Sequence, residues 1–500
     1  MKRNNWFVAK IKNVGKRIPI IMLALLMVVM SFTACSSTGS YTSGGVVRIS
    51  IDEWIGYKSL LDANGGLTTA PGSIFDNLGL NVEFVVMNDY TASSTSLISG
   101  DLAGAGYTVN RYAFLQSKFN NAGVEVVMPF ITNYSNGGDG IIANSDIATI
   151  KDLVGKKIAV PEFSEAQTLV EWLITHSNLS DEQINNIRSN MTYFNSAEET
   201  GQAFFAGEVD AAATWEPYLT MAASSTASRI LFDTSDGTNL ILSGIIFRKD
   251  FLAENEDFMI KFINGVLEAS VMYKTNFDYV RGMTLFQTME DADIIDMANG
   301  ADLATWGQNM KLLTSDAVSM YEDMANIWIQ VGESAFPNHA ADAFTSEYME
   351  KLRSKYEGTN MASTEKKFDD DKTVIIESPE ALLEYSANIQ FELNSYEISV
   401  ESYPELDEFV KVAKVLDGAY IQIEGNASLR ATGITDAQIE EFSLERANSV
   451  ANYFIAKGIK KERIITIGNG DSKPADPENP SGAVNRRTEF LFKTKVGYEL

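Results

Sequence analysis

Apolar and polar positions alternate along residues 46–250 in a way that predicts strands and helices in turn. Short apolar runs suited to buried strands are separated by stretches in which apolar residues recur at helical spacing. Such alternation predicts an α/β fold with a largely parallel sheet. The expected strands are residues 46–51, 82–87, 124–130, 157–160, 209–214 and 241–247, and the clearest helices are residues 166–176 and 198–205.

The pattern changes twice further along the chain. From residue 250 to about residue 356 it is almost wholly helical, and residues 358–372 are small and polar and then acidic. A second mixed pattern follows, with strands expected at 389–393, 420–424, 464–467 and 490–493, a helix at 401–416, and another that Ser443 caps and Gly458 ends. We therefore predict a first domain at residues 46–357, a linker at 358–375 and an α+β domain at 376–500.

The first 35 residues have the pattern of an export signal. Residues 1–17 carry six Lys and Arg and no acidic residue, and an apolar run at 18–30 precedes small residues and Cys35. That run is too short for a comfortable membrane span. Cys35 and the three residues before it resemble the lipobox of bacterial lipoproteins, which implies a lipidated Cys35 tethered by residues 36–45. The alternative is a secreted protein with an incidental thiol.

Composition narrows the chemistry of the folded part. Cys35 is the only cysteine and His176 and His339 are the only histidines. Disulfides and Cys-based sites are therefore excluded once Cys35 is acylated, and a His-rich metal site or a His-based triad is disfavoured. We expect no cofactor, no metal and no catalysis. A net charge of −27 disfavours nucleic acid as a partner.

The candidate ligand-binding residues follow predicted strands. In open α/β sheets ligands lie beyond the carboxyl ends of strands, where Trp215 and Glu216 follow the run at 209–214. The alternative is that Trp215 fills the core and Glu216 caps a helix. Asp139 follows two glycines whose N–H groups could face an anion, and its carboxylate could hold an amine or only stabilise a turn. The full predicted set is Trp54, Tyr57, Tyr107, Thr108, Asp139, Ser164, Trp215 and Glu216.

Several motifs in the first domain occur in a characteristic order. They are residues 54–57 (WIGY), 135–140 (SNGGDG), 152–160 (DLVGKKIAV), 210–218 (DAAATWEPY), 306–309 (WGQN) and 327–332 (IWIQVG). This region resembles solute-binding proteins of ABC importers of the taurine, sulfonate and nitrate type. The resemblance implies a type II periplasmic-binding-protein-like fold, in which two α/β lobes close on one small solute, with a permease and an ATPase as partners.

Three motifs of the second domain also resemble a family. Residues 443–447 (SLERA), 467–470 (IGNG) and 485–489 (NRRTE) are similar to the OmpA-like peptidoglycan-binding domain. The resemblance implies that Arg446 binds a carboxylate of the wall peptide, with Arg486 and Ser428 beside it. Ser428 occupies the position at which that family has an aspartate. The sequence therefore does not decide whether this chain binds the cell wall. Asp436 is a possible substitute.

Together these features predict an extracytoplasmic, lipid-anchored substrate-binding component of an ABC importer for a small organic or anionic solute, held near the cell wall by an OmpA-like domain. Two alternatives remain. One is an envelope sensor or structural protein that uses the solute-binding domain for signalling. The other is an enzyme of the thiamine-pyrimidine synthase type, which the absence of an available thiol disfavours.

Overall fold

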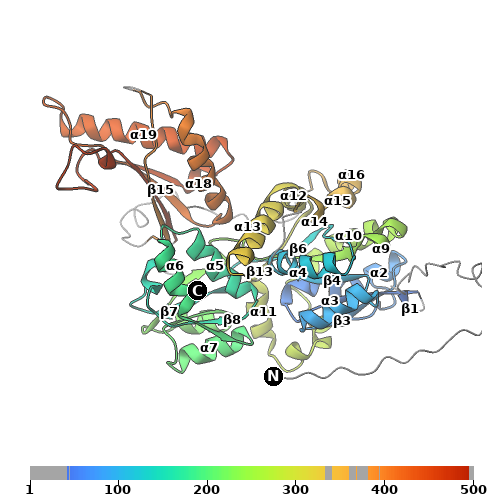
Figure 1. The fold of residues 1–500 in the computed structure, drawn as a ribbon. Helices are drawn as coiled ribbons and strands as arrows, with labels where there is room; N and C mark the ends of the chain where they lie inside the picture. The colour runs from blue at the N-terminus through green and yellow to red at the C-terminus, as the bar shows by residue number, and fades with distance from the viewer. Residues whose placement is uncertain are drawn as a thin grey trace, which may run out of the picture. The chain divides into compact units, whose positions relative to one another are not determined.

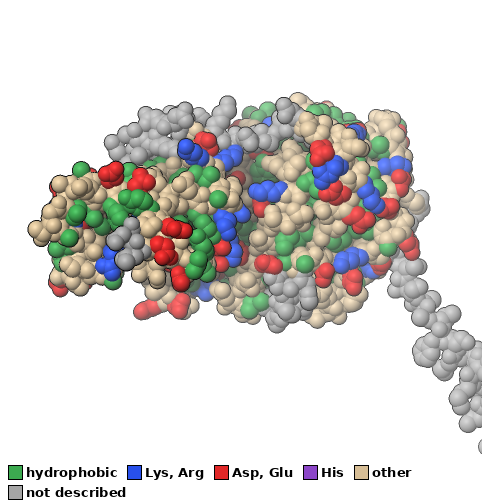
Figure 2. Space-filling view, turned by 90° about the horizontal axis from the view of Figure 1, so that it is seen from above, with side chains coloured by type: hydrophobic (Ala, Val, Ile, Leu, Met, Phe, Trp, Pro, Cys, Tyr) green, Lys and Arg blue, Asp and Glu red, His purple; other side chains and the backbone are tan. Residues whose placement is uncertain are grey.

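The computed structural model of the 500-residue chain describes residues 42–43, 45–332, 340–359, 368, 381–392 and 395–494. Cys35, His339, the predicted signal and most of the predicted tether therefore lie outside the described residues, but β1 (Thr42–Ser43) of the tether pairs with β2 (Val46–Ile51). Among the described helices, none is long and apolar enough to cross a membrane. Acidic and basic side chains are interspersed over the face of the molecule shown in Figure 2.

The first lobe is built on a sheet whose main strands lie in the order β3-β2-β4-β12-β6-β13. Strands β3, β2 and β4 are parallel, and β12 pairs antiparallel with both β4 and β6. Every residue of β12 is buried, as expected for a central strand covered by helices on both faces. The strands are β1 (Thr42–Ser43), β2 (Val46–Ile51), β3 (Val82–Val86), β4 (Gly104–Thr108), β5 (Val126–Val127), β6 (Ile131–Ser135), β12 (Leu242–Arg248) and β13 (Ala301–Leu303).

The second lobe repeats this arrangement in a smaller sheet of order β9-β8-β10-β7-β11. Strands β9, β8 and β10 are parallel, while β7 pairs antiparallel with β10 and β11. The strands are β7 (Asp139–Asn144), β8 (Ile158–Pro161), β9 (Met191–Phe194), β10 (Ala211–Trp215) and β11 (Ser228–Asp233). In each lobe one central strand runs antiparallel to its neighbours: β12 in the first lobe and β7 in the second. Each of these strands directly follows a point where the chain crosses from one lobe to the other. This shared topology confirms the predicted two-lobed α/β fold.

Helices pack on both sheets. Figure 1 shows α3 and α4 beside β3 and β4, and α5 and α7 beside β7 and β8. In the first lobe they are α1 (Lys58–Asn64), α2 (Ile74–Asn77), α3 (Tyr90–Ser99) and α4 (Val109–Asn121). In the second they are α5 (Glu165–Thr175), α6 (Asp181–Ser189), α7 (Ala197–Phe205) and α8 (Tyr218–Ala223). The predicted helices at 166–176 and 198–205 are confirmed.

The return to the first lobe is followed by the helical region that the sequence predicts. Its helices are α9 (Lys249–Glu254), α10 (Glu256–Ala269), α11 (Asp291–Asn299), α12 (Trp306–Lys311), α13 (Ala317–Gln330), α14 (Ala340–Ala343), α15 (Glu347–Lys351) and α16 (Arg353–Tyr356). Trp328 on α13 is fully buried, and its ring lies 5.0 Å from that of Phe114 on α4. These helices therefore complete the core of the first lobe.

The C-terminal domain is a four-stranded sheet of order β14-β17-β15-β16 with two long helices. Its elements are β14 (Leu383–Ala387), α18 (Tyr403–Val415), β15 (Tyr420–Gly425), α19 (Asp436–Ala456), β16 (Ile464–Gly468) and β17 (Thr488–Lys493). Leu406, Ala447 and Phe490 are all completely buried, from α18, α19 and β17 respectively. The predicted α+β domain and its helix at 401–416 are confirmed.

Two local predictions in this domain are wrong. Residues 389–393 do not form the first strand; Phe391 makes only an isolated bridge to Ile398, and the strand is β14. Ser443 does not cap α19, since the helix begins seven residues earlier behind the capping box of Thr435 and Gln438. The Ser443 hydroxyl instead donates to the Glu440 carbonyl and accepts from the Gly470 N–H.

Candidate functional site

Asp52 lies directly after β2, at the carboxyl end of a parallel strand. Its carboxylate accepts hydrogen bonds from the Tyr90 hydroxyl at 2.8 Å and from the Trp54 backbone N–H at 3.0 Å. Burial, with a smaller contribution from the nearby carboxylate of Glu165, raises the pKa of Asp52 to about 6. The environment of Asp52 therefore favours its protonated form more than water does.

Glu165 links the two lobes. It is the first residue of α5 in the second lobe, and it accepts a hydrogen bond at 2.8 Å from the Thr108 hydroxyl of the first lobe. The Arg111 guanidinium, also from the first lobe, lies 3.4 Å from the other carboxylate oxygen. Arg111 also stacks 4.0 Å from the centre of the Tyr90 ring. One carboxylate thus joins polar groups from both lobes.

Two helix N-termini meet at this carboxylate. Thr108 caps α4 and accepts from the Arg111 N–H, while Ser164 caps α5 and accepts from the Gln167 N–H. The N-terminal end of a helix carries a partial positive charge that favours anions. The protein's own Glu165 carboxylate lies in the position that these two helix ends favour for a negative group.

Asp139 lies where the chain crosses into the second lobe. The Ser135 hydroxyl donates to its carboxylate at 2.7 Å, and Ser135 is also 2.8 Å from the Thr234 hydroxyl on the return crossing. The Gly137 N–H donates to Thr234 as well, at 2.9 Å. Burial raises the pKa of Asp139 to about 7, and the charge of Glu165 adds to this rise. Asp139 therefore stands beside the hinge and within electrostatic reach of Glu165.

These residues form what we call the interlobe cluster: Asp52, Tyr90, Arg111, Asp139 and Glu165. It contains three carboxyl groups and one guanidinium. Arg111 pairs with Glu165 and its charge also acts on Asp52, whereas no described cation pairs with Asp139. An ammonium group placed here would favour the ionised form of both aspartates and offset their desolvation. The arrangement is suited to binding a small solute that carries an amine.

The predicted aromatic residues fall into two groups. Tyr57 and Tyr107 are both only 1% exposed, and the Tyr107 hydroxyl bonds with Ser93 inside the first lobe. Trp54 is partly exposed; its indole N–H donates to Asn133 at 2.8 Å. A Cβ at Gly138 would lie 3.1 Å from the Trp54 ring, so the glycine allows the hinge backbone to approach it. Trp54 thus lies close to the hinge.

Trp215 and Glu216 end β10 beside Asp139. Trp215 pairs with Asp139 in the β10–β7 register, and its side chain is 43% exposed, so it does not fill the core. The Glu216 carboxylate accepts hydrogen bonds from the Thr220 N–H at 3.1 Å and from the Thr220 hydroxyl at 3.0 Å. This is the helix-capping role given above as the alternative for Glu216. Ser164 likewise caps α5. These positions leave Trp215 free to contact a solute.

Asp52, Tyr90, Arg111 and Glu165 were not predicted as site residues. Two signals were available in the sequence: Asp52 follows a predicted strand directly, and Thr108 stands three residues before Arg111, as a helix cap does. The pairing of Arg111 with Glu165 joins residues 54 positions apart in different lobes. No local pattern marks such a contact.

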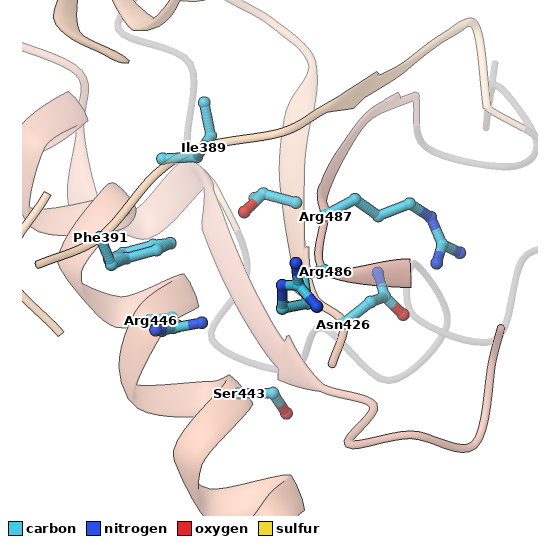
Figure 3. A pocket seen from close by; sticks show the side chains of 9 residues that line it. Ile389, Phe391, Asn426, Ser443, Arg446, Arg486 and Arg487 are labelled. Atoms are coloured by element: carbon cyan, nitrogen blue, oxygen red, sulfur yellow. The ribbon is translucent and has the colours of Figure 1, made fainter. Parts of the chain in front are cut away.

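The C-terminal domain contains a small pocket, about 20 Å³ in volume and partly open to solvent. Figure 3 shows Arg446 extending from α19 toward Arg486, with Phe391 beside it. The residues that line the pocket are Ile389, Phe391, Gly425, Asn426, Ser443, Arg446, Arg486, Arg487 and Thr488. Ser428 is outside this lining but lies 3.4 Å from Arg486, and Asp436 instead pairs with Arg430. The structure thus brings together Arg446, Arg486 and Ser428, which sequence reasoning had grouped.

Two family models match separate parts of the chain. Residues 74–275 match the family described as NMT1/THI5 like, and residues 390–488 match the OmpA family. The chain therefore combines an NMT1/THI5-like domain with an OmpA family domain, as the sequence motifs predicted.

Similar proteins cover different parts of the chain. A Bacillus subtilis protein named for the binding of aliphatic sulfonates is 23% identical over 283 residues, covering 55% of this chain and 78% of that protein. The photosystem I P700 chlorophyll a apoprotein A2 of Gloeobacter violaceus is 32% identical over 117 residues, and the match spans only 13% of its length. Among solved structures, the aliphatic sulphonate-binding protein of Escherichia coli is similar at 16% identity and a TM-score of 0.48, covering 61% of this chain and 99% of its own. A desulfurization enzyme is similar at 14% identity, with a TM-score of 0.42, covering 61% and 98%.

Proposed function

We propose that the protein is the solute-binding component of an ABC importer and carries no catalytic activity. The observation that carries this proposal is the Glu165 carboxylate, which the second lobe provides and which accepts hydrogen bonds from Thr108 and Arg111 of the first. A contact of this kind forms only when the lobes are together. A solute that adds further contacts to both lobes would shift the equilibrium toward the closed state.

The chemistry of the interlobe cluster narrows the class of solute. A nitrate or a simple alkanesulfonate brings only negative charge to a site in which carboxyl groups outnumber guanidiniums. A taurine-like aminosulfonate has an ammonium that Asp52 and Asp139 can bind. Its sulfonate would have to share Arg111 with Glu165 near the N-terminal ends of α4 and α5. We therefore favour a small amine-bearing organic solute over a plain anion.

The cellular location belongs to the same proposal. Similarity to sulfonate-binding proteins and to the OmpA family supports a place in the cell envelope. Lipidation of Cys35 would anchor the chain to the membrane, and the OmpA family domain would hold it near the cell wall. A permease and an ATPase would be its partners.

The test is an isothermal titration of the full chain, purified in detergent, with taurine, ethanesulfonate and nitrate. We expect measurable binding of taurine and at least tenfold weaker binding of the other two. The variant Glu165→Gln keeps the shape of the side chain but removes the charge that holds Arg111, and it should weaken taurine binding. Uptake of labelled taurine should also fall in cells that lack the gene. Binding without any change in uptake would favour the sensor alternative.

A further inference from the structure

Phe163 has a strained backbone conformation in the turn between β8 and α5. Among the residues that the structure describes, it is the only non-glycine residue with a positive φ, at 52°. The Cβ of an ordinary side chain disfavours this left-handed conformation, and a bulky aromatic residue is unusual there. The turn is held by two hydrogen bonds: the Phe163 N–H donates to the Gln167 side chain at 2.6 Å, and the Gln167 N–H donates to the Ser164 hydroxyl. Such strain persists only where the surrounding structure compensates for it.

The compensating contacts are aromatic, and they come from the other lobe. The Phe163 ring stacks on the ring of Phe114 on α4, with the ring centres 5.3 Å apart and an angle of 19° between the planes. It also lies 6.2 Å from the ring of Trp328 on α13, which is fully buried. Phe114 and Trp328 belong to the first lobe, whereas Phe163 belongs to the second. Aromatic pairs of this kind stabilise a contact beyond the area that they bury.

Helix α5 continues this contact with the first lobe along its length. The Asn110 amide on α4 donates to the Thr168 hydroxyl at 3.0 Å, and both side chains are buried. At the end of α5, the Nε2 atom of His176 lies 3.9 Å from a carboxylate oxygen of Asp323 on α13. None of these contacts includes a solute atom. They therefore favour the closed state of the lobes with or without a solute.

We propose that Phe163 is a positioning residue whose ring stabilises the closed state of the two lobes. Glu165 lies two residues further along the chain, so anchoring the turn to the first lobe also brings Glu165 to Thr108 and Arg111. Closed lobes must open before a solute can enter or leave, so Phe163 slows both steps. Only this consequence for the solute rests on the proposed function, because the closure itself needs no solute.

The experiment measures the separation of the lobes in the full chain without a solute, by pulsed electron paramagnetic resonance. Cys35 is the only cysteine, so Cys35→Ser leaves no native thiol to label. Spin labels are attached to Ser99→Cys on α3 of the first lobe and to Gln202→Cys on α7 of the second, both exposed positions. We expect one dominant distance in this background, and a second, clearly populated distance when Phe163→Ala is added. Each aromatic pair shifts an equilibrium by roughly two- to tenfold, so losing both should lower the ratio of closed to open molecules by about tenfold or more.

Three variants separate the role of the ring from a general loss of structure. Phe163→Tyr retains the ring and should restore the distance of the background. Phe163→Gly removes the ring and also relieves the backbone strain, so it should open the lobes even if Phe163→Ala does not fold. Phe205→Ala is the matched control, because the Phe205 ring packs on Phe204 and Tyr218 within the second lobe. It should leave the distance unchanged.

A double substitution tests the contact across the lobes directly. In a Phe114→Ala background, adding Phe163→Ala should change the distances less than it does alone, because one of the two ring pairs is already lost. Any of three results would overturn the proposal: distances that Phe163→Gly leaves unchanged, an equal change in Phe205→Ala, or a full effect of Phe163→Ala in the Phe114→Ala background. A chain that opens in Phe163→Ala but binds no taurine would support this inference while contradicting the proposed solute.

Discussion

If the solute carries an amine, its affinity should rise steeply with pH. In the free protein the pKa of Asp139 is raised to about 7 and that of Asp52 to about 6, in both cases chiefly by burial. An ammonium binds the ionised carboxylates, so binding at low pH must first expel a proton. The groups facing Asp52 are Tyr90, Arg111 and Glu165, and Glu165 also raises the pKa of Asp139.

The size of the effect follows from these pKa values. At pH 5 only about 1% of Asp139 and about 10% of Asp52 are ionised, whereas at pH 8 both are about 90% ionised or more. Taurine should therefore bind about a hundredfold more tightly at pH 8 than at pH 5 if it requires Asp139 alone, and about tenfold if it requires Asp52 alone. Ethanesulfonate, which has no ammonium, should show the opposite trend because it favours the protonated carboxyl groups.

The assay is isothermal titration at pH 5, 6, 7 and 8, repeated at pH 6 in two buffers with different enthalpies of ionisation to count protons. Taurine binding should release protons. Asp139→Asn is the matched control, since the amide can still accept from Ser135, and it should remove the part of the pH dependence between pH 6 and pH 7. Taurine affinity that is flat or falls between pH 5 and pH 8 would refute the amine-binding interpretation of the cluster.

Four further predictions test other parts of the molecule. The pKa of Asp139 is higher in the folded chain than in the unfolded chain. The folded chain should therefore lose stability as pH rises from about 4 to about 7, by at most about 4 kcal/mol. Thermal unfolding of the ligand-free chain should show this pH dependence, and Asp139→Asn should flatten it. Trp215→Ala should cost about 2 kcal/mol or more of taurine binding, and an unchanged titration would remove Trp215 from the site. Cys35→Ser should move the chain from the membrane fraction to the soluble fraction, and unchanged partition would contradict lipid anchoring. Peptidoglycan should retain the native chain only weakly, Ser428→Asp should improve retention and Arg446→Ala should abolish it; tight retention that survives Arg446→Ala would show that wall binding uses other residues.

The local pattern of apolar and polar residues predicts those helices and strands whose own residues determine their structure. Strand β2 and helix α18 were predicted to within two residues, because each has a continuous apolar pattern with clear ends. The prediction of a strand at residues 389–393 was wrong because a segment forms a strand only where a partner strand pairs with it. Residues 383–387 find the partner β17, whereas Phe391 finds only a bridge to Ile398. The start of α19 was missed although Thr435 and Gln438 have the spacing of a capping box.

Much of the interlobe cluster could not be predicted from local pattern, for a physical reason. Trp54, Asp139 and Trp215 end predicted strands or flank the hinge glycines, so their positions follow from local order. Arg111 and Glu165 acquire their roles only when two lobes meet, and that contact depends on both crossings of the chain. The sequence could predict a solute site between the lobes, but not which charged side chains would line it.

The interlobe cluster and the C-terminal pocket have opposite electrostatic character, so a ligand suited to one site is unsuited to the other. Carboxyl groups predominate in the interlobe cluster, and two arginines face each other without a carboxylate in the C-terminal pocket. One solute cannot satisfy both: an ammonium that stabilises ionised Asp139 would be repelled by Arg446, and an anion that pairs with Arg446 would oppose Asp52 and Asp139. We therefore expect a solute of the interlobe cluster not to use the C-terminal pocket, and a taurine titration should be unaffected by Arg446→Gln. Loss of taurine binding in that variant would mean that the amine site had been placed in the wrong domain.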